Sequence, residues 1–177
     1  MQDLQAAKEC VKRYHADLIA PGISSETALQ AHVIADYHWK GFHPFGELTS
    51  AKDVAEKFWT PLRQSLTSMQ WREDIFFAGL NEIDGFESTW VVSMGHLMGL
   101  FDHSWLGIQP TGKMIMLRYA EFHKVEDNKI AETAFYFDIP HLMAQAGQSP
   151  FTHQLGAQNV QPGPQPHNAL MYDDADP

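Results

Sequence analysis

The sequence predicts one α+β domain in which helices come first and strands follow. Apolar residues recur at three- and four-residue steps through the first third of the chain, which is typical of helices. Beyond Met69 they fall in extended runs separated by Asn, Asp and Gly, which is typical of strands and turns. Helices followed by strands in this order indicate helices packed on one face of an antiparallel sheet. A chain of 177 residues is long enough to bury a core of this kind.

Three helices are expected in the first part of the chain. Residues 3–19 carry a single apolar stripe and end at Pro21-Gly22, and residues 25–33 form a second, short helix. The aromatic and histidine-rich segment 36–46 is interrupted by Gly and Pro, so we expect an ordered loop there. The third helix runs over residues 49–67 and begins with a hydroxyl cap and an acid in its first turn, while Pro61 bends or splits it.

Four strands and a closing helix are expected in the second part. The strands cover residues 71–80, 88–101, 113–125 and 130–138, and the helix runs from Pro140 to Gly147. Residues 1–147 therefore form the domain. Residues 148–177 form an extended tail rich in Gly, Pro and Gln that is able to wrap a neighbouring subunit. The second face of the sheet needs a cover, and we expect a homodimer or higher homo-oligomer to supply it.

The charge and composition limit the classes of partner. A net charge of −10 and a pI of about 5.3 argue against binding to nucleic acid or to an anionic membrane surface. No apolar run approaches the roughly 18 residues of a membrane span, and no signal peptide is recognisable, so a cytoplasmic location is expected. The single cysteine excludes an intrachain disulfide. The 21 aromatic residues and eight Met are sufficient for a core and also suit a pocket for a small apolar organic ligand.

The last hairpin brings polar and aromatic side chains onto one face. A turn centred on Asp127-Asn128 pairs Val125 with Ile130, and side chains then alternate along both strands. Two interpretations stay open, because this face either meets solvent or lines a cavity under the N-terminal helices. A slip of one residue would exchange the faces of one strand. In this register the shared face carries Tyr119, Glu121, His123, Glu132, Tyr136 and Asp138.

Asp138 is the leading candidate for a catalytic group. Its carboxylate follows the aromatic run 135–137, and aromatic surroundings raise the pKa of a carboxyl group toward the range of an acid/base catalyst. The structural alternative is that Asp138 caps the helix that begins at Pro140. In the predicted register His123 lies on the same face as Asp138. His96 has the parity to reach a pocket, although a core histidine is the more common role at such a position.

Several segments of the chain resemble the SnoaL-like polyketide cyclases. The segment 118–132 is similar to the family's last hairpin, and 138–147 is similar to its closing Asp-x-x-x-Leu-(Leu/Met)-x-Gln-x-Gly pattern. The segments 43–47, 58–62 and 105–112 fit as well. The resemblance implies the cone-shaped fold shared with nuclear transport factor 2, in which a curved antiparallel sheet wraps on N-terminal helices around a cavity. It also implies an intramolecular aldol cyclisation by a pocket carboxylate, without metal or nucleotide.

The resemblance assigns the site residue by residue. Asp138 matches the acid/base carboxylate and His123 the assisting histidine. No metal or other cofactor is expected, because the chain has no His-Glu-x-x-His motif and no Cys pair. Asn128 stands where the family commonly has Gly, and Ala134 stands where it frequently has Trp. The substrate of the family's cyclases therefore cannot be assigned to this chain from the resemblance. The residues expected to bind substrate are Glu121, Tyr136, His96, His43, Trp39 and Phe58.

Three functions remain open from the sequence. The first is a cofactor-independent cyclase or isomerase acting on a small, largely apolar carbonyl compound. The second is a non-catalytic binding or assembly module of the same fold, which Asp138 bonded only to backbone amides would favour. The third is a hydrolase, which would need Arg118 on the same face as a second carboxylate, whereas the predicted register places it on the opposite face.

Overall fold

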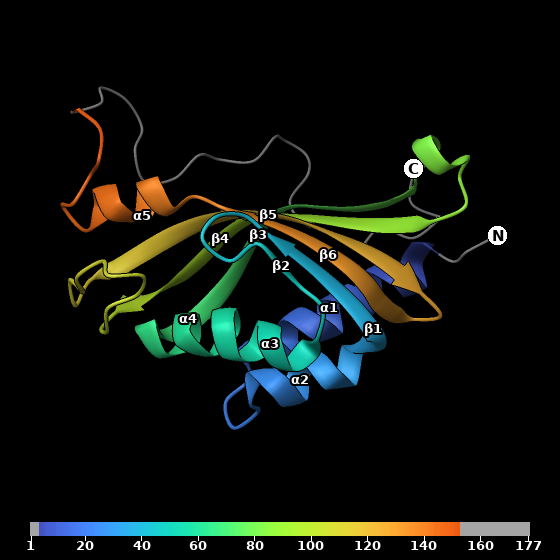
Figure 1. Ribbon diagram of the computed structural model, residues 1–177, viewed down its shortest axis with the longest axis horizontal. Helices are drawn as coiled ribbons and strands as arrows, with labels where there is room; N and C mark the ends of the chain where they lie inside the picture. The colour runs from blue at the N-terminus through green and yellow to red at the C-terminus, as the bar shows by residue number, and fades with distance from the viewer. Residues whose placement is uncertain (1–3, 153–177) are drawn as a thin grey trace.

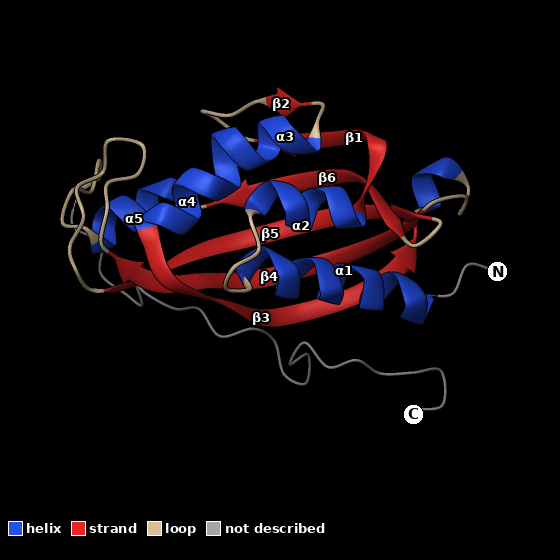
Figure 2. Ribbon diagram, turned by 90° about the horizontal axis from the view of Figure 1, so that it is seen from below, coloured by secondary structure: helices blue, strands red, loops and turns tan. Residues whose placement is uncertain are grey.

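The computed structural model describes residues 4–152 and has two layers, a curved sheet and a group of helices on its concave face (Figure 1). The helices in this layer are α1 (Leu4–Ile19), α2 (Ser25–His32), α3 (Ala51–Val54) and α4 (Thr60–Ser65). Figure 2 shows them lying across the sheet, with α1 over the strands at one side. This arrangement confirms the predicted α+β class and the predicted packing of helices on one face.

The sheet has six strands in the order β2-β1-β6-β5-β4-β3. All neighbouring pairs are antiparallel except β1 and β6, which are parallel. A short helix, α5 (Ile139–Gln145), follows the last strand, and a 3₁₀ turn, Glu82–Asp84, joins β3 to β4. The strands are β1 (Val33–Gly41), β2 (Glu47–Leu48), β3 (Leu66–Leu80), β4 (Thr89–Phe101), β5 (Met114–Glu126) and β6 (Lys129–Phe137).

Hydroxyl caps begin two of the helices, as expected for the third. The Ser24 side chain accepts a hydrogen bond from Thr27 N, and the Ser50 side chain accepts one from Asp53 N. The third predicted helix is one continuous run whose hydrogen bonding becomes π-helical over Ala55–Trp59, a segment that ends two residues before Pro61. Because proline has no N–H to donate, a local change in the helical hydrogen-bonding pattern is expected there.

The segment 36–46 is not the loop that its Gly and Pro residues suggested. Most of it belongs to β1, which pairs with β6 and β2. The strand signal was the alternation of Tyr37 and Trp39, both fully buried, with more exposed neighbours. The expectation of a purely antiparallel sheet was wrong for the same reason, since β1 is the strand that runs parallel to β6.

The register of the last hairpin differs from the predicted one by a single residue. Val125 pairs with Ile130 as expected, but Lys124 pairs with Glu132, so Ala131 is an extra residue in β6. The bulge turns every later side chain of β6 to the opposite face. Glu132 and Tyr136 therefore do not share a face with Glu121, whereas Thr133 does. The β5 half of the prediction is correct, because Tyr119, Glu121 and His123 are buried on the concave face.

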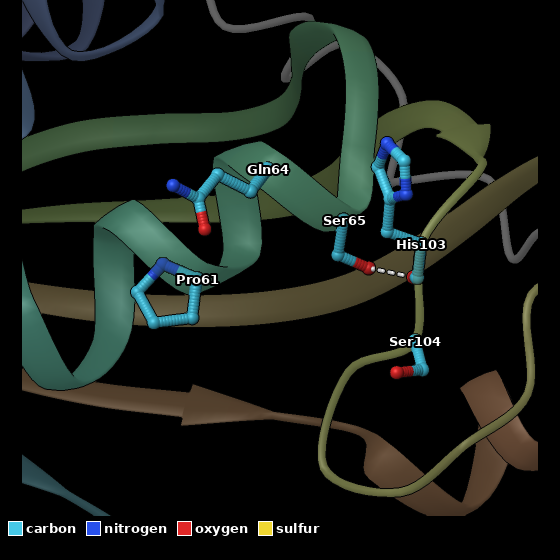
Figure 3. Close-up of a pocket in the computed structure, with 5 residues that line it drawn as sticks. All are labelled: Pro61, Gln64, Ser65, His103 and Ser104. Carbon is cyan, nitrogen blue, oxygen red and sulfur yellow. Dashed lines mark hydrogen bonds between the residues drawn. The ribbon is translucent and has the colours of Figure 1, made fainter.

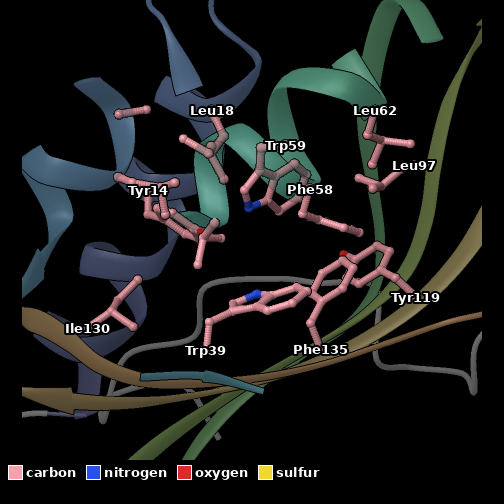
Figure 4. Packing of buried hydrophobic residues seen from close by; sticks show 14 of the residues in the cluster. Tyr14, Leu18, Trp39, Phe58, Trp59, Leu62, Leu97, Tyr119, Ile130 and Phe135 are labelled. Atoms are coloured by element: carbon pink, nitrogen blue, oxygen red, sulfur yellow. The ribbon is translucent and has the colours of Figure 1, made fainter. Parts of the chain in front are cut away.

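The core lies between the concave face and the helices and is strongly aromatic (Figure 4). Trp39 packs against Phe58 with ring centroids 5.0 Å apart, and Phe58 lies 5.3 Å from Phe135. Among residues 4–152, no helix is long and apolar enough to cross a membrane. Most of the predicted tail, residues 153–177, lies outside the described part of the chain.

Gly95 on β4 faces a bulge in β3, and this contact gives a test of the packing. A Cβ atom at Gly95 would overlap the carbonyl oxygen of Arg72. We expect Gly95→Ala to lower the free energy of unfolding by about 1–3 kcal/mol. Gly79→Ala, in the neighbouring strand with no atom within 4 Å of the added Cβ, is the matched control. It should be neutral or slightly stabilising in urea denaturation, and equal losses in the two variants would contradict the packing.

Candidate functional site

The candidate site is centred on Glu121, a fully buried carboxylate on the concave face of β5. Its Oε1 lies 2.5 Å from Nε2 of His15 on α1, and its Oε2 lies 3.2 Å from Nε2 of His123, also on β5. Both imidazoles are buried as well. Burying an isolated carboxylate anion costs several kcal/mol of free energy. The contacts with the two imidazoles offset this cost and allow Glu121 to stay ionised in the core.

Each imidazole is held from its other side by a second partner. His15 Nδ1 lies 2.7 Å from Oε1 of Glu73, and Lys12 forms an ion pair with the other oxygen of Glu73. His123 Nδ1 lies 2.9 Å from the hydroxyl of Thr133, which the bulge in β6 brings to this face. The outer partners fix the orientation of both rings, so both Nε2 atoms point to Glu121.

Aromatic and hydroxyl groups enclose the cluster. Trp71 stacks on His15 with ring centroids 4.0 Å apart and an interplanar angle of 16°. The Trp71 indole donates to the Tyr119 hydroxyl at 2.6 Å, and that hydroxyl lies 2.8 Å from Ser93 Oγ. These groups bury the cluster, so its charges are little screened and interact strongly.

A set of polar atoms in this region lacks hydrogen-bond geometry with any described residue. The contacts between Glu121 and the two imidazoles have ion-pair distances but not the angles of hydrogen bonds. Buried polar atoms are normally paired, so such a group is a mark of a site for a ligand. The unpartnered atoms are Oε1 and Oε2 of Glu121, Nε2 of His15 and His123, the hydroxyls of Tyr14 and Tyr37, and Nε1 of Trp39 and Trp59.

The charges in the cluster shift the pKa values of His15 and Glu121. Burial alone lowers the pKa of His15, but the charge of Glu121, the close contact with it and the contact with Glu73 outweigh this effect and raise the pKa to about 9. Burial raises the pKa of Glu121, but the charges and Nε2 atoms of His15 and His123 lower it to about 2. At neutral pH the geometry therefore holds an imidazolium against a carboxylate. Burial and the Glu121 charge also raise the pKa of Tyr14 and Tyr37.

The structure brings together only part of the site that the sequence predicted. Glu121 and His123 are in contact, although with each other rather than with Asp138. Trp39 and Phe58 are fully buried in the aromatic core beside this region. Their predicted role in substrate binding stays a prediction. His43 is exposed in the turn between β1 and β2.

Asp138, Tyr136 and His96 lie away from the concave cluster. Asp138 is the N-cap of α5: its side chain accepts a hydrogen bond of 3.0 Å from His141 N and lies 3.7 Å from Arg118. Tyr136 is 45% exposed on the other face of the sheet. His96 pairs across the sheet with Arg118 and contacts Asp74 at 3.2 Å, so it also belongs to that face. The predicted contact of Asp138 with His123 is wrong, because the bulge reverses the end of β6.

Two members of the cluster, His15 and Glu73, were not identified from the sequence. His15 follows Val11 by four residues and precedes Leu18 by three, so it belongs to the buried stripe of α1. A histidine within an apolar stripe was the available signal. Glu73 shares parity with Trp71, but the bulge after it hides the pattern of β3.

A pocket of about 400 Å³ lies beside α4 (Figure 3). None of the residues that line it belongs to the cluster around Glu121. Its wall includes Ser65, whose hydroxyl donates to the His103 carbonyl at 2.8 Å. The lining holds one titratable side chain, His103, and no carboxylate to pair with it. The residues that line the pocket are Pro61, Gln64, Ser65, His103 and Ser104.

Comparison with known proteins shows the fold. No protein-family model and no curated protein matches the sequence. Solved structures do match, and one is a protein from Jannaschia sp. CCS1 that carries the provisional name SnoaL-like polyketide cyclase. It is 15% identical, with a TM-score of 0.65 over 85% of this chain and 97% of that one.

Two further similar structures carry other names. AclR from Streptomyces galilaeus, provisionally named a hydroxylase, is 16% identical with a TM-score of 0.64 over 84% of this chain and 85% of its own. An NTF2-like protein from Burkholderia thailandensis E264 is 19% identical with a TM-score of 0.54 over 84% and 99%. The chain has the cone-like α+β fold of SnoaL-like and NTF2-like proteins, as predicted, and the names of its neighbours cover more than one chemistry.

The shifted pKa values of His15 and Glu121 predict how stability depends on pH. The pKa of His15 is raised from 6.5, so its contribution is complete below pH 6.5 and is lost as the pH rises through about 9. The pKa of Glu121 is lowered from 4.5, so its contribution is complete above pH 4.5 and is lost as the pH falls toward about 2. The cluster therefore stabilises the fold most between pH 4.5 and 6.5.

Urea denaturation of the wild type and of His15→Gln across pH 5 to pH 9 tests this dependence. Lys12, Glu73 and Glu121 are the charged groups that face His15, and all three remain in the variant. We expect the difference in unfolding free energy between the two proteins to shrink as the pH rises above 6.5. A difference that stays constant over this range would show that His15 is neutral in the folded protein.

Proposed function

We propose that the protein is an acid/base enzyme that cyclises or isomerises a small, largely apolar carbonyl compound. The observation that carries the proposal is the buried carboxylate of Glu121 between two imidazole Nε2 atoms, at 2.5 Å and 3.2 Å. Such a set holds a proton acceptor and a proton donor side by side in an apolar enclosure, which is what proton abstraction next to a carbonyl requires.

His15 supplies the electrophilic half of this chemistry. With a pKa of about 9 it carries a proton on both ring nitrogens at neutral pH, and Nδ1 is engaged with Glu73. Nε2 faces Glu121 Oε1 at 2.5 Å and is able to donate to a substrate carbonyl oxygen in place of that contact. A charged donor in a water-poor site stabilises the enolate oxygen that forms when the neighbouring carbon loses its proton.

Glu121 supplies the base. Its pKa of about 2 makes it a weak base while both Nε2 atoms face it. A substrate oxygen that takes the His15 Nε2–H for itself removes one of these two contacts and so raises the basicity of the carboxylate. The base is thereby released only when the carbonyl is in place. Glu121 then takes the proton from the carbon next to the carbonyl, and that C–H electron pair becomes the enolate.

The enolate has two outcomes. Its carbon attacks a second carbonyl of the same molecule, which closes a ring and leaves an alkoxide that takes the proton from Glu121. Alternatively, the enolate takes that proton back from Glu121 at another position, which isomerises the compound. The hydroxyls of Tyr14 and Tyr37, both buried and close enough to Glu121 for its charge to raise their pKa, supply further hydrogen bonds to substrate oxygens. The aromatic walls suit a flat apolar body.

Asp138 remains the competing candidate for the base. Its similarity to the family's closing pattern supports it, whereas its surroundings do not. The side chain is 35% exposed, caps α5 and lies beside Arg118, and each of these conditions favours a simple structural carboxylate. If Glu121 is the base, the substrate binds on the concave face of the sheet. If Asp138 is the base, the substrate binds on the opposite face.

A non-catalytic binding module is the second candidate. The observation in its favour is the complete burial of Glu121 and His123, since a buried ion-pair network can also serve only to fix the packing of α1 on the sheet. Asp138 satisfying a backbone N–H at the start of α5 is the other feature expected of such a module.

Exchange of hydrogen for deuterium next to a carbonyl separates these candidates without knowledge of the natural substrate. A panel of aromatic ketones and β-keto esters is incubated with the protein in deuterated buffer and followed by NMR. We expect Glu121→Gln to lower the exchange rate by about 10²–10⁴, and Asp138→Asn to leave it within a few-fold of the wild type. The opposite pattern would assign the base to Asp138, and no protein-dependent exchange in the wild type would favour the binding module.

A further inference from the structure

We propose that His15, Glu121 and His123 bind a divalent transition-metal ion of the Zn²⁺ type. The three side chains form a two-histidine, one-carboxylate set, which suits Zn²⁺, Fe²⁺ and related ions. The inference concerns what the cluster binds and does not rest on the proposed reaction.

The positions of the ligand atoms support the site. One atom from each residue lies within 4.8 Å of the other two, and all three residues are buried. Metal–ligand bonds of about 2.0–2.2 Å in a tetrahedron place ligand atoms roughly 3.3 Å apart. In the structure Glu121 Oε1 lies 2.5 Å from His15 Nε2 and Oε2 lies 3.2 Å from His123 Nε2, so each imidazole faces its own carboxylate oxygen at a distance close to this value or shorter.

The groups that hold the second nitrogen of each imidazole, Glu73 and Thr133, are of the kind found around metal-binding histidines. A ligating imidazole normally donates its second N–H to a carboxylate, a carbonyl or another oxygen atom, which fixes the ring and its tautomer. His15 has Glu73 in this position at 2.7 Å, and His123 has the Thr133 hydroxyl at 2.9 Å. Lys12 in turn holds Glu73. Both Nε2 atoms are therefore turned toward the Glu121 carboxylate.

The charges of the cluster accommodate a cation. Glu73 and Glu121 are two carboxylates, and the positive charges that face them are Lys12 and the proton of His15, in a setting where Glu121 is fully buried. A divalent cation bound at His15 Nε2 takes the place of that proton and keeps Glu121 paired with a positive charge. Three protein ligands leave one position open for water or substrate.

Other histidine–carboxylate pairs in residues 4–152 do not share these features. Each of them has a single histidine: His32 lies 2.7 Å from Asp17, His38 lies 3.1 Å from Glu47 and His96 lies 3.2 Å from Asp74. We expected no metal from the sequence because the three ligands come from α1 and β5, which are far apart along the chain. Short-range motifs detect only ligands on one element.

Occupancy by an ion has a direct consequence for the proposed chemistry. A carboxylate bound to a metal ion is no longer available to take a proton, so metal binding and acid/base turnover by Glu121 exclude each other. The ion would then regulate the site, and the binding experiment below is independent of any turnover.

Titration of the chelator-treated protein with Zn²⁺ tests the site directly. We expect one ion per chain by calorimetry and a rise in the melting temperature that increases with Zn²⁺ concentration. Glu121→Gln and His123→Gln should each weaken binding by more than about 100-fold, and Glu73→Gln, which keeps all three ligands, by about 10- to 100-fold. His32→Gln is the matched control, since it removes a histidine paired with a carboxylate outside the cluster, and it should bind as the wild type does.

X-ray absorption by the Zn²⁺-loaded wild type provides a readout that does not depend on any variant folding. The expected first shell consists of nitrogen and oxygen with the scattering of two imidazoles. A sulfur ligand, which only Cys10 or a methionine would provide, or fewer than two imidazoles would overturn the proposal. Unchanged affinity in folded Glu121→Gln, or absence of Zn²⁺ binding by the wild type, would overturn it as well.

Discussion

The structure depends on one unusual requirement, which is to keep the carboxylate of Glu121 charged inside an aromatic core. The cost of burying such a group amounts to several kcal/mol unless it is paired. One imidazole contacts each of its two oxygens, and each imidazole is held by a further group, Glu73 or Thr133. The chain of contacts runs from Lys12 on α1 through β3 and β5 to β6. The same contacts therefore position α1 on the sheet and define the site.

The bulge at Ala131 determines which carboxylate occupies the interior. Without the extra residue, Glu132 would lie opposite His123, and the end of β6 would turn Tyr136 and Asp138 toward the helices. With it, Thr133 lies opposite His123 and offers a small neutral hydroxyl. A second carboxylate at that position would repel Glu121 and raise its pKa. Because of the bulge, Glu121 is the carboxylate that contacts both imidazoles, and Glu132 does not compete for His123.

Much of the fold was predictable because its signals are local. The apolar stripe of α1, the cap at Ser50 and the turn at Asp127-Asn128 act within a few residues, and the structure agrees with all three. The register beyond the bulge was not predictable, since an inserted residue in a strand leaves the apolar pattern almost unchanged. The strand at 33–41 was missed because Gly41 and Pro44 outweighed the alternation of Tyr37 and Trp39. His15 and Glu73 were missed because only the tertiary structure brings them to Glu121.

The function of this fold has to be argued from the site, because similar backbones carry cyclase and hydroxylase names at 15–16% identity. The resemblance in the closing segment pointed to Asp138, but in this chain that aspartate caps a helix on the side of the sheet opposite the cluster. The concave face instead carries an acid, two imidazoles and unpartnered phenol and indole groups. A proton on His15 and a metal ion satisfy the same demand, since either one neutralises Glu121. Chemistry at this site therefore depends on which of the two cations occupies it.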